Sequence, residues 1–208
     1  NCDLYPTHQL GPILSWMDIN CGDRFDTITS TATDTFGPVE HFTRTRGADD
    51  PLAQKSRYTQ GDIVTSVIKT KRGKTIVSNY DMQLPRPYDN RWMAQGTRGI
   101  YSEARSSVCL NYSHEWEPFE PYHEKYRHPW ADITGGGHGG VDLRELALFV
   151  ESVRNKTQTP LDVYDSVTMS SIFDLSGQSI AEGSMPVKAP DFTRGRWETR
   201  KPYFAVVD

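Results

Sequence analysis

A phenol, a hydroxyl and an imidazole lie within four consecutive residues near the start of the chain, Tyr5, Pro6, Thr7 and His8. An imidazole suits proton transfer near neutral pH, and a phenol can donate a proton or polarise a carbonyl. A histidine at the start of a helix is also commonly a surface residue or part of the helix cap. The residues alone therefore leave catalysis and capping both open for Tyr5 and His8.

A second candidate is the loop Leu84-Pro85-Arg86-Pro87-Tyr88-Asp89, which follows a predicted strand. Its two prolines favour an extended backbone, which would hold Arg86 and Tyr88 in fixed positions. A rigid loop at the end of a strand suits ligand contacts. The alternative is a purely structural loop at a sheet edge.

Glycines from Gly135 to Gly140 satisfy the G-x-G-x-x-G spacing of a dinucleotide-binding turn and precede a predicted helix. The surroundings do not fit, because residues 128–132 do not form an apolar parallel strand and no strand ending in an acid follows. The run instead indicates close approach of backbone to a ligand or a neighbouring chain. His138 within it is a candidate ligand contact or a surface loop histidine.

Histidines and glutamates are dense between residues 114 and 128, as in a metal site. Their spacing is irregular, no H-E-x-x-H is present, and Pro118 and Pro121 prevent a single helical face. We interpret the segment as a polar, aromatic flap and predict no metal site.

The elements that must position these residues begin with a helix. Its apolar face follows the i, i+3, i+4, i+7 spacing, at Leu10, Ile13, Leu14 and Met17. Thr7 is the expected cap and Gly22 the expected end, which places His8 at the amino end of the helix. Alternating threonines predict a strand over residues 25–33, and residues 37–61 are expected to form a long surface loop.

Two strand pairs and a single strand are expected next. The first pair is a hairpin of residues 63–70 and 75–82, and the second pair consists of residues 91–95 and 99–103. A further strand is predicted over residues 108–112.

Two helices complete the pattern. The first has an apolar stripe of Leu143, Leu146, Ala147, Val150 and Val153. Pro160 opens the second, and residues 183–208 are expected to form an extended tail. Strands that precede helices predict an α+β fold, an open and mainly antiparallel sheet covered on one face by helices.

Composition narrows the class of protein. The chain has 208 residues, 36% of them hydrophobic and 24% charged, with a net charge of −4. This balance suits one globular domain and argues against a nucleic-acid partner, which needs a basic stripe. No apolar run is long enough for a membrane span. Three cysteines without CxxC spacing leave a periplasmic or a cytoplasmic location open.

Six segments together carry a family resemblance. They are Tyr5–Pro12, Pro85–Tyr88, Gly96–Ile100, Gly136–Gly140, Asn155–Asp165 and Pro190–Gly195. The chain resembles, over nearly its whole length, the carboxy-terminal domain of NAD-dependent glycoside hydrolase family 109, whose type activity is α-N-acetylgalactosaminidase. That family lies within the glucose–fructose oxidoreductase/inositol dehydrogenase superfamily. The Y-P-T-H and P-R-P-Y segments are specific to this branch, and the glycine–histidine turn is shared more widely.

The resemblance implies an amino-terminal Rossmann domain that binds NAD and that this chain lacks. It also implies an unusual route of hydrolysis: oxidation of the sugar at C3, elimination after loss of the C2 proton, addition of water and re-reduction. This route needs no flanking pair of carboxylates. By position, Tyr5, Pro6, Thr7 and His8 would contact the sugar, with His8 transferring the proton and Tyr5 lying where sugar and nicotinamide meet.

The resemblance also implies that Tyr88 and, less specifically, His138 contact the sugar. Asp89-Asn90 stands where the family pattern has Ser-Arg, which puts the exact sugar in question. The expected partners are an N-acetylhexosamine glycan and further copies of the chain, bound through the open sheet face. The alternatives are a sugar or polyol dehydrogenase of the same superfamily and a non-catalytic assembly module. Residues 1–208 alone are expected to be inactive.

Overall fold

The computed structural model describes residues 1–55, 58–128, 131 and 137–202. These residues form two compact units. Unit 1 contains residues 1–85 and the later described residues 160–202, and unit 2 contains residues 86–159.

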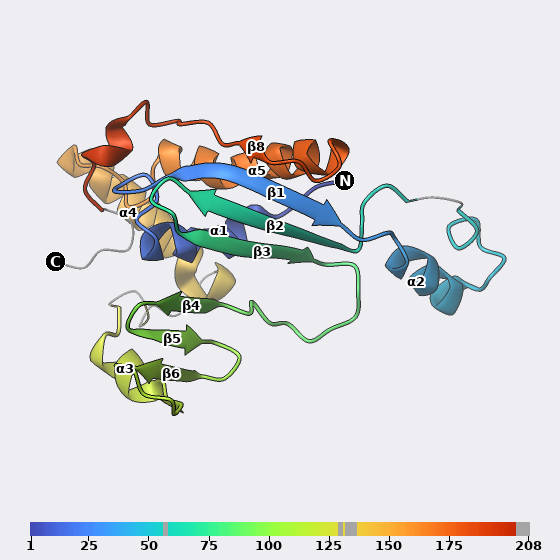
Figure 1. Ribbon diagram of the computed structural model, residues 1–208, viewed down its shortest axis with the longest axis horizontal. Coiled ribbons are helices and arrows are strands. Elements are labelled where there is room, and N and C mark those ends of the chain that lie inside the picture. Colours follow the sequence, from blue (N-terminus) through green and yellow to red (C-terminus); the bar gives the residue numbers. More distant parts are fainter. Residues whose placement is uncertain (56–57, 129–130, 132–136, 203–208) are drawn as a thin grey trace. The chain divides into compact units, whose positions relative to one another are not determined.

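The sheet of unit 1 has four strands in the order β3-β2-β1-β8 (Figure 1). They are β1 (Phe25–Ala32), β2 (Ile63–Thr70), β3 (Thr75–Asp81) and β8 (Val187–Lys188). All of their pairings are antiparallel. The predicted first strand and the predicted hairpin are confirmed to within a residue. The strand β8 lies within the predicted tail and pairs with β1.

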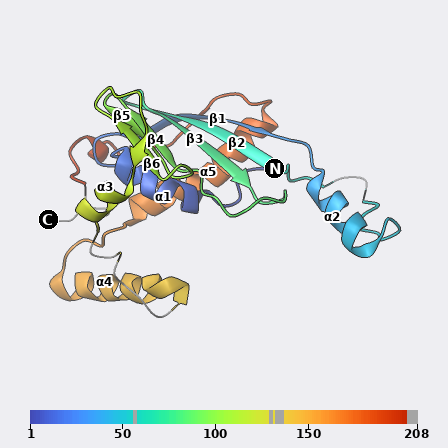
Figure 2. The ribbon, with the colours of Figure 1, turned by 90° about the horizontal axis from the view of Figure 1, so that it is seen from below.

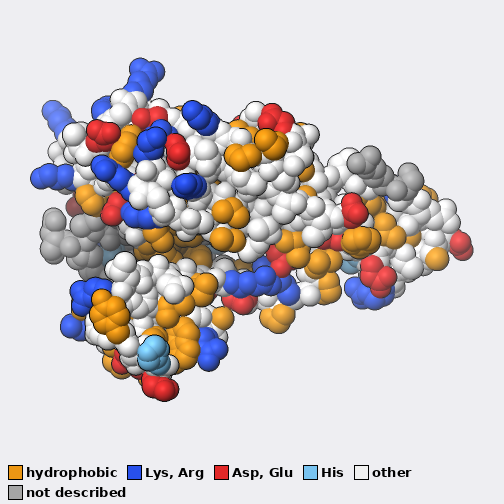
Figure 3. Space-filling model, in the orientation of Figure 1, with side chains coloured by type: hydrophobic (Ala, Val, Ile, Leu, Met, Phe, Trp, Pro, Cys, Tyr) orange, Lys and Arg blue, Asp and Glu red, His pale blue; other side chains and the backbone are white. Residues whose placement is uncertain are grey.

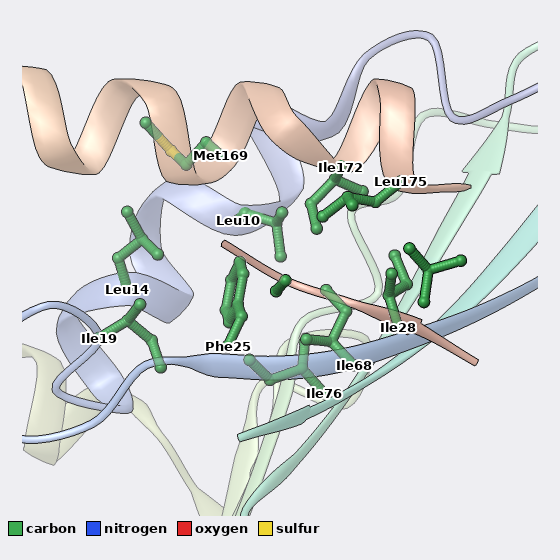
Figure 4. Close-up of a cluster of buried hydrophobic side chains, with 12 residues drawn as sticks. Leu10, Leu14, Ile19, Phe25, Ile28, Ile68, Ile76, Met169, Ile172 and Leu175 are labelled. Atoms are coloured by element: carbon green, nitrogen blue, oxygen red, sulfur yellow. The ribbon is translucent and has the colours of Figure 1, made fainter. Parts of the chain in front are cut away.

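Two helices, α1 (Pro6–Trp16) and α5 (Val163–Ala181), lie on the same side of this sheet, as Figures 1 and 2 show. Between helices and sheet lies the core of Figure 4, to which both helices and all four strands contribute apolar side chains. Leu10, Ile28, Ile68 and Ile172 are fully buried there. Burial of each such side chain contributes about 1.5–3 kcal/mol. The opposite face of the sheet carries no helix of the described unit.

Helix α1 differs from its prediction at both ends. It begins at Pro6 with Tyr5 as N-cap, so Thr7 is not the cap. Proline suits this position because its missing N–H would have no partner in the first turn. The helix ends at Trp16, well before Gly22. The prediction that His8 lies at the amino end of the helix is confirmed.

The prediction of a loop over residues 37–61 was wrong in its first part, which forms α2 (Gly37–Arg46). The signals of a helix are present: a proline in the first turn, Glu40 after it, basic residues in the last turn and Gly47 as C-cap. The segment was nevertheless predicted as a loop, because residues 37–61 are mostly polar and show no apolar helical face. The buried Asp62 accepts hydrogen bonds from the backbone N–H groups of Phe36 and Gly37 and so fixes the start of the helix.

Helix α5 begins at Val163, three residues after the proline expected to open it. Asp162 is its N-cap and forms a capping box with Asp165. After β8 the chain makes a short 3-10 turn, Arg196–Glu198, whose Trp197 is buried. The Trp197 carbonyl accepts a 2.7 Å hydrogen bond from the backbone N–H of Gly22.

Unit 2 has its own antiparallel sheet, in the order β4-β5-β6-β7. The strands are β4 (Met93–Gly96), β5 (Gly99–Ser102), β6 (Ser107–Leu110) and β7 (Glu117–Pro118). The helical segments are α3 (Glu120–Lys125), the 3-10 turn Gly137–Gly140 and α4 (Val141–Asn155). Together the two units confirm the α+β class, with the antiparallel strands in two sheets.

Candidate functional site

Tyr5 and His8 lie together at the amino end of α1. Their rings stack with centroids 4.6 Å apart and planes inclined by 28°. Both side chains are exposed, as is Thr7, whereas Pro6 is buried beneath them. The first backbone N–H groups of a helix lack partners within it and favour negative charge nearby. The turn therefore combines an imidazole, a phenol and a hydroxyl with an electropositive backbone.

The start of this turn is fixed by a hydrogen bond to Asp3, which is fully buried. The Asp3 carboxylate accepts a 3.1 Å hydrogen bond from the backbone N–H of Tyr5, an Asx-turn that sets the start of the helix. The Asp3 backbone N–H donates to the Ser176 hydroxyl at 2.9 Å. Burial raises the pKa of Asp3, although the bonds from Tyr5 and Ser78 partly oppose this.

The residues before the turn are fixed by the chain that precedes β2. The side chain of Gln60 accepts from the Cys2 backbone N–H at 3.1 Å and donates to the Cys2 carbonyl at 2.9 Å. The Asn1 side chain accepts from the Gly61 backbone N–H at 3.0 Å. Sequence analysis missed Asp3 and Gln60. The only local signal of Asp3 is that an aspartate lies three residues before a helix that begins with proline, and Gln60 has no local signal.

Tyr88 lies in unit 2 and is 84% exposed. The Arg86 guanidinium donates to the carbonyls of Pro87 and Asp89, at 3.1 and 2.9 Å. These bonds join the Arg86 side chain to the backbone of the loop on both sides of Tyr88.

His138, also in unit 2, has a left-handed backbone with φ of 47°. Its Nδ1 lies 3.0 Å from each carboxylate oxygen of Asp142, in the first turn of α4. The hydrogen bond to Asp142 and the charge of that carboxylate raise the pKa of His138. Of the glycine run, Gly135 and Gly136 lie outside the described residues.

The structure therefore places Tyr5, Pro6, Thr7 and His8 together in unit 1, and Tyr88 and His138 in unit 2. Within the described part of the chain, no group of at least three His, Cys, Asp or Glu side chains is arranged to hold a metal ion. Nor does any described helix have the length and apolarity needed to cross a membrane.

The fold has counterparts among solved structures. Levoglucosan dehydrogenase in complex with NADH superposes with a TM-score of 0.54 at 17% identity, over 81% of this chain and 45% of that one. An oxidoreductase domain protein from Kribbella flavida gives 0.51 at 14% identity, over 81% of this chain and 45% of that one. The chain thus shares the fold of a part of these oxidoreductases.

The sequence identifies the family. Residues 1–199 match the family described as glycosyl hydrolase 109, C-terminal domain, and the chain belongs to that family. It is 40% identical to the α-N-acetylgalactosaminidase of Tannerella forsythia, over 99% of this chain and 46% of that protein. It is 39% identical to a glycosyl hydrolase family 109 protein of Stenotrophomonas maltophilia, over 99% of this chain and 47% of that protein. The chain thus spans about half the length of these curated relatives.

Proposed function

We propose that this chain is the sugar-binding domain of an NAD-dependent glycosidase that hydrolyses N-acetylgalactosaminides. The observation that carries the proposal is the family match over residues 1–199, together with the name of the Tannerella forsythia relative. The proposal is supported by the exposed Tyr5–His8 stack, because a phenol and an imidazole are both able to transfer protons.

His8 is the proposed base for the C2 proton of the sugar. A neutral imidazole can accept that proton once the adjacent C3 carries a carbonyl, because the carbonyl stabilises the resulting negative charge. The stacked Tyr5 ring restricts the orientation of the imidazole, and the electropositive first turn of α1 favours the developing charge. Elimination of the C1 substituent and addition of water would then cleave the glycosidic bond, and return of the hydride would restore the alcohol at C3.

NAD bound to the other half of the complete protein would supply the hydride acceptor for C3 and would later return the hydride. Tyr5 is the residue of this chain proposed to meet the nicotinamide. Its ring is half exposed at the N-terminus of α1, which fits a contact with a flat, polar ring. Tyr88 and His138 are proposed as further sugar contacts, since each presents an exposed polar side chain. The carbonyls on either side of Tyr88 accept from Arg86, and the His138 ring pairs with Asp142.

A second candidate function is a plain sugar dehydrogenase, which the levoglucosan dehydrogenase fold favours. The glycosidase would return the hydride to the sugar, whereas the dehydrogenase would leave it on the cofactor as NADH. In the complete enzyme, hydrolysis of an aryl N-acetylgalactosaminide with no net NADH supports the glycosidase. Net, stoichiometric NADH formation without release of the aryl group would refute it in favour of the dehydrogenase. The absence of both reactions would favour a non-catalytic assembly module.

We also propose that the uncovered face of the unit 1 sheet binds a further copy of the chain. Figure 3 shows this face, where apolar side chains lie scattered and Lys and Arg side chains gather toward one end. Val67 and Val77 are cross-strand partners, and they are 42% and 58% exposed. A charge at Val77 should dissociate the oligomer in sedimentation velocity, and the exposed Phe173 of α5 provides the control. Equal masses for Val77→Lys, Phe173→Lys and wild type would reject this interface.

A further inference from the structure

A row of serines crosses the covered face of the unit 1 sheet. Ser30 of β1 pairs with Ser66 of β2, and Ser66 pairs with Ser78 of β3. The three are only 1%, 0% and 3% exposed. The same face buries Ile28 and Ile68, so a polar row here is unexpected. A buried hydroxyl is costly unless it is hydrogen-bonded, and each serine should therefore have an identifiable partner.

Two of the serines satisfy each other, since the hydroxyls of Ser30 and Ser66 are 2.8 Å apart. Ser78 differs, because its hydroxyl bonds outside the sheet, to the side chains of Asp3 and Gln9. The Ser78–Asp3 bond is 3.5 Å long. The row therefore ends at the segment that carries the candidate site.

Asp3 and Gln9 lie on either side of the Tyr5–His8 turn in the sequence. Asp3 also holds the Tyr5 backbone N–H, and its own N–H is held by Ser176 of α5. A single hydroxyl of β3 thus joins the segment before the turn to the helix residue that follows His8. Both ends of the turn are consequently fixed to the same point of the sheet.

The Ser78 hydroxyl is the donor in both contacts. Its partners are Oε1 of Gln9 and Oδ2 of Asp3, and both of these oxygens accept. A hydroxyl has one proton, so Ser78 can donate fully only once. The single Ser78 proton is therefore shared between two acceptors, one on each side of the Tyr5–His8 turn in the sequence.

We propose that Ser78, acting with Asp3, is the positioning residue that holds the Tyr5–His8 stack in its reactive orientation. The expected effect of Ser78 on kcat rests on the proposed function. Its expected effect on the positions of the Tyr5 and His8 rings does not. Ser78 does not touch the sugar. It acts through Asp3 and Gln9 on the backbone that carries both rings.

The structural consequence is tested in the 208-residue chain by NMR. The stacked Tyr5 ring should shift the ring-proton resonances of His8 upfield. In Ser78→Ala these resonances should move toward random-coil positions, and in Ser78→Thr, which keeps the hydroxyl, they should stay. Ser66→Ala is the matched control, because it removes an equally buried serine hydroxyl from the neighbouring strand. Equal shifts in Ser78→Ala and Ser66→Ala would overturn the proposal.

The catalytic consequence is tested in the complete enzyme. Ser78→Ala should lower kcat by about tenfold to a hundredfold with little change in KM, the size of effect that a small misplacement of catalytic groups produces. Ser66→Ala should leave kcat within about twofold of wild type. If Ser78→Ala fails to fold, Gln9→Met removes one of the two Ser78 bonds at a half-buried position and should show the same pattern of shift and kcat.

The two failures are distinguishable. A wild-type enzyme that hydrolyses no N-acetylgalactosaminide refutes the proposed function and leaves the NMR result to decide whether Ser78 positions the turn. An active wild type whose kcat is equally affected by Ser78→Ala and Ser66→Ala refutes the positioning role alone.

Discussion

Replacement of His8 by alanine separates catalysis from stability. The His8 side chain is exposed at the start of α1, and its ring stacks on Tyr5 at 4.6 Å. Alanine leaves the apolar core untouched, because the buried members of α1 are Pro6, Leu10 and Leu14. The change therefore removes one imidazole and one ring contact.

The expected magnitudes follow from these contacts. An aromatic pair contributes about 0.5–1.5 kcal/mol beyond its buried area, and this exposed pair should lie at the lower end. Loss of a general base costs about a hundredfold to ten-thousandfold in rate. At about 1.36 kcal/mol per factor of ten, this equals roughly 2.7–5.4 kcal/mol of transition-state stabilisation. The loss of activity should thus exceed the loss of stability several times over.

The assay is the steady-state release of an aryl group from its N-acetylgalactosaminide by the complete enzyme, with unfolding by guanidinium measured on the same samples. His41→Ala is the matched control, since His41 is an exposed histidine of α2 whose ring contacts Phe42. His41→Ala should change neither the rate of aryl release nor the free energy of unfolding appreciably.

Two results would refute this reasoning. A His8→Ala enzyme with the wild-type kcat/KM removes His8 from the mechanism. A loss of stability as large as the loss of transition-state stabilisation would mean that His8 has a structural role instead.

Three further changes have definite expected outcomes. Because burial raises the pKa of Asp3, its ionised form costs stability as the pH rises through that pKa. Wild type should therefore gain stability relative to Asp3→Asn between about pH 7 and pH 4 in guanidinium unfolding, and a pH-independent difference would contradict this. Asp142→Asn should lower the pKa of His138 in an NMR titration, because the hydrogen bond to Asp142 raises it, and an unchanged pKa would show that the pair does not form in solution. Asp162→Ala should cost about 2 kcal/mol of unfolding free energy through loss of the α5 cap, against less than about 0.5 kcal/mol for the exposed Asp174→Ala, and equal costs would exclude capping as the cause.

Local patterns sufficed for much of the fold. Alternating threonines located β1, and a four-residue turn between apolar runs located the β2–β3 hairpin, because strand periodicity depends only on neighbouring residues. The same reasoning failed for α2, whose mean composition is polar and whose start depends on Asp62, far along the chain. It also misplaced the cap of α1, because the backbone of Tyr5 is fixed by Asp3 rather than by Thr7.

The candidate residues were readable in the sequence, because tyrosine and histidine carry their chemistry wherever they are placed. The sequence alone also determined the family, the α+β class and the amino-end position of His8. Only the tertiary structure decided which residues support the site. Asp3 meets Ser78 and Ser176 across 75 and 173 residues of chain, and no periodicity or local propensity encodes such distant hydrogen bonds. They exist because packing of α1 and α5 on the sheet buries these polar groups together, where each must find a partner.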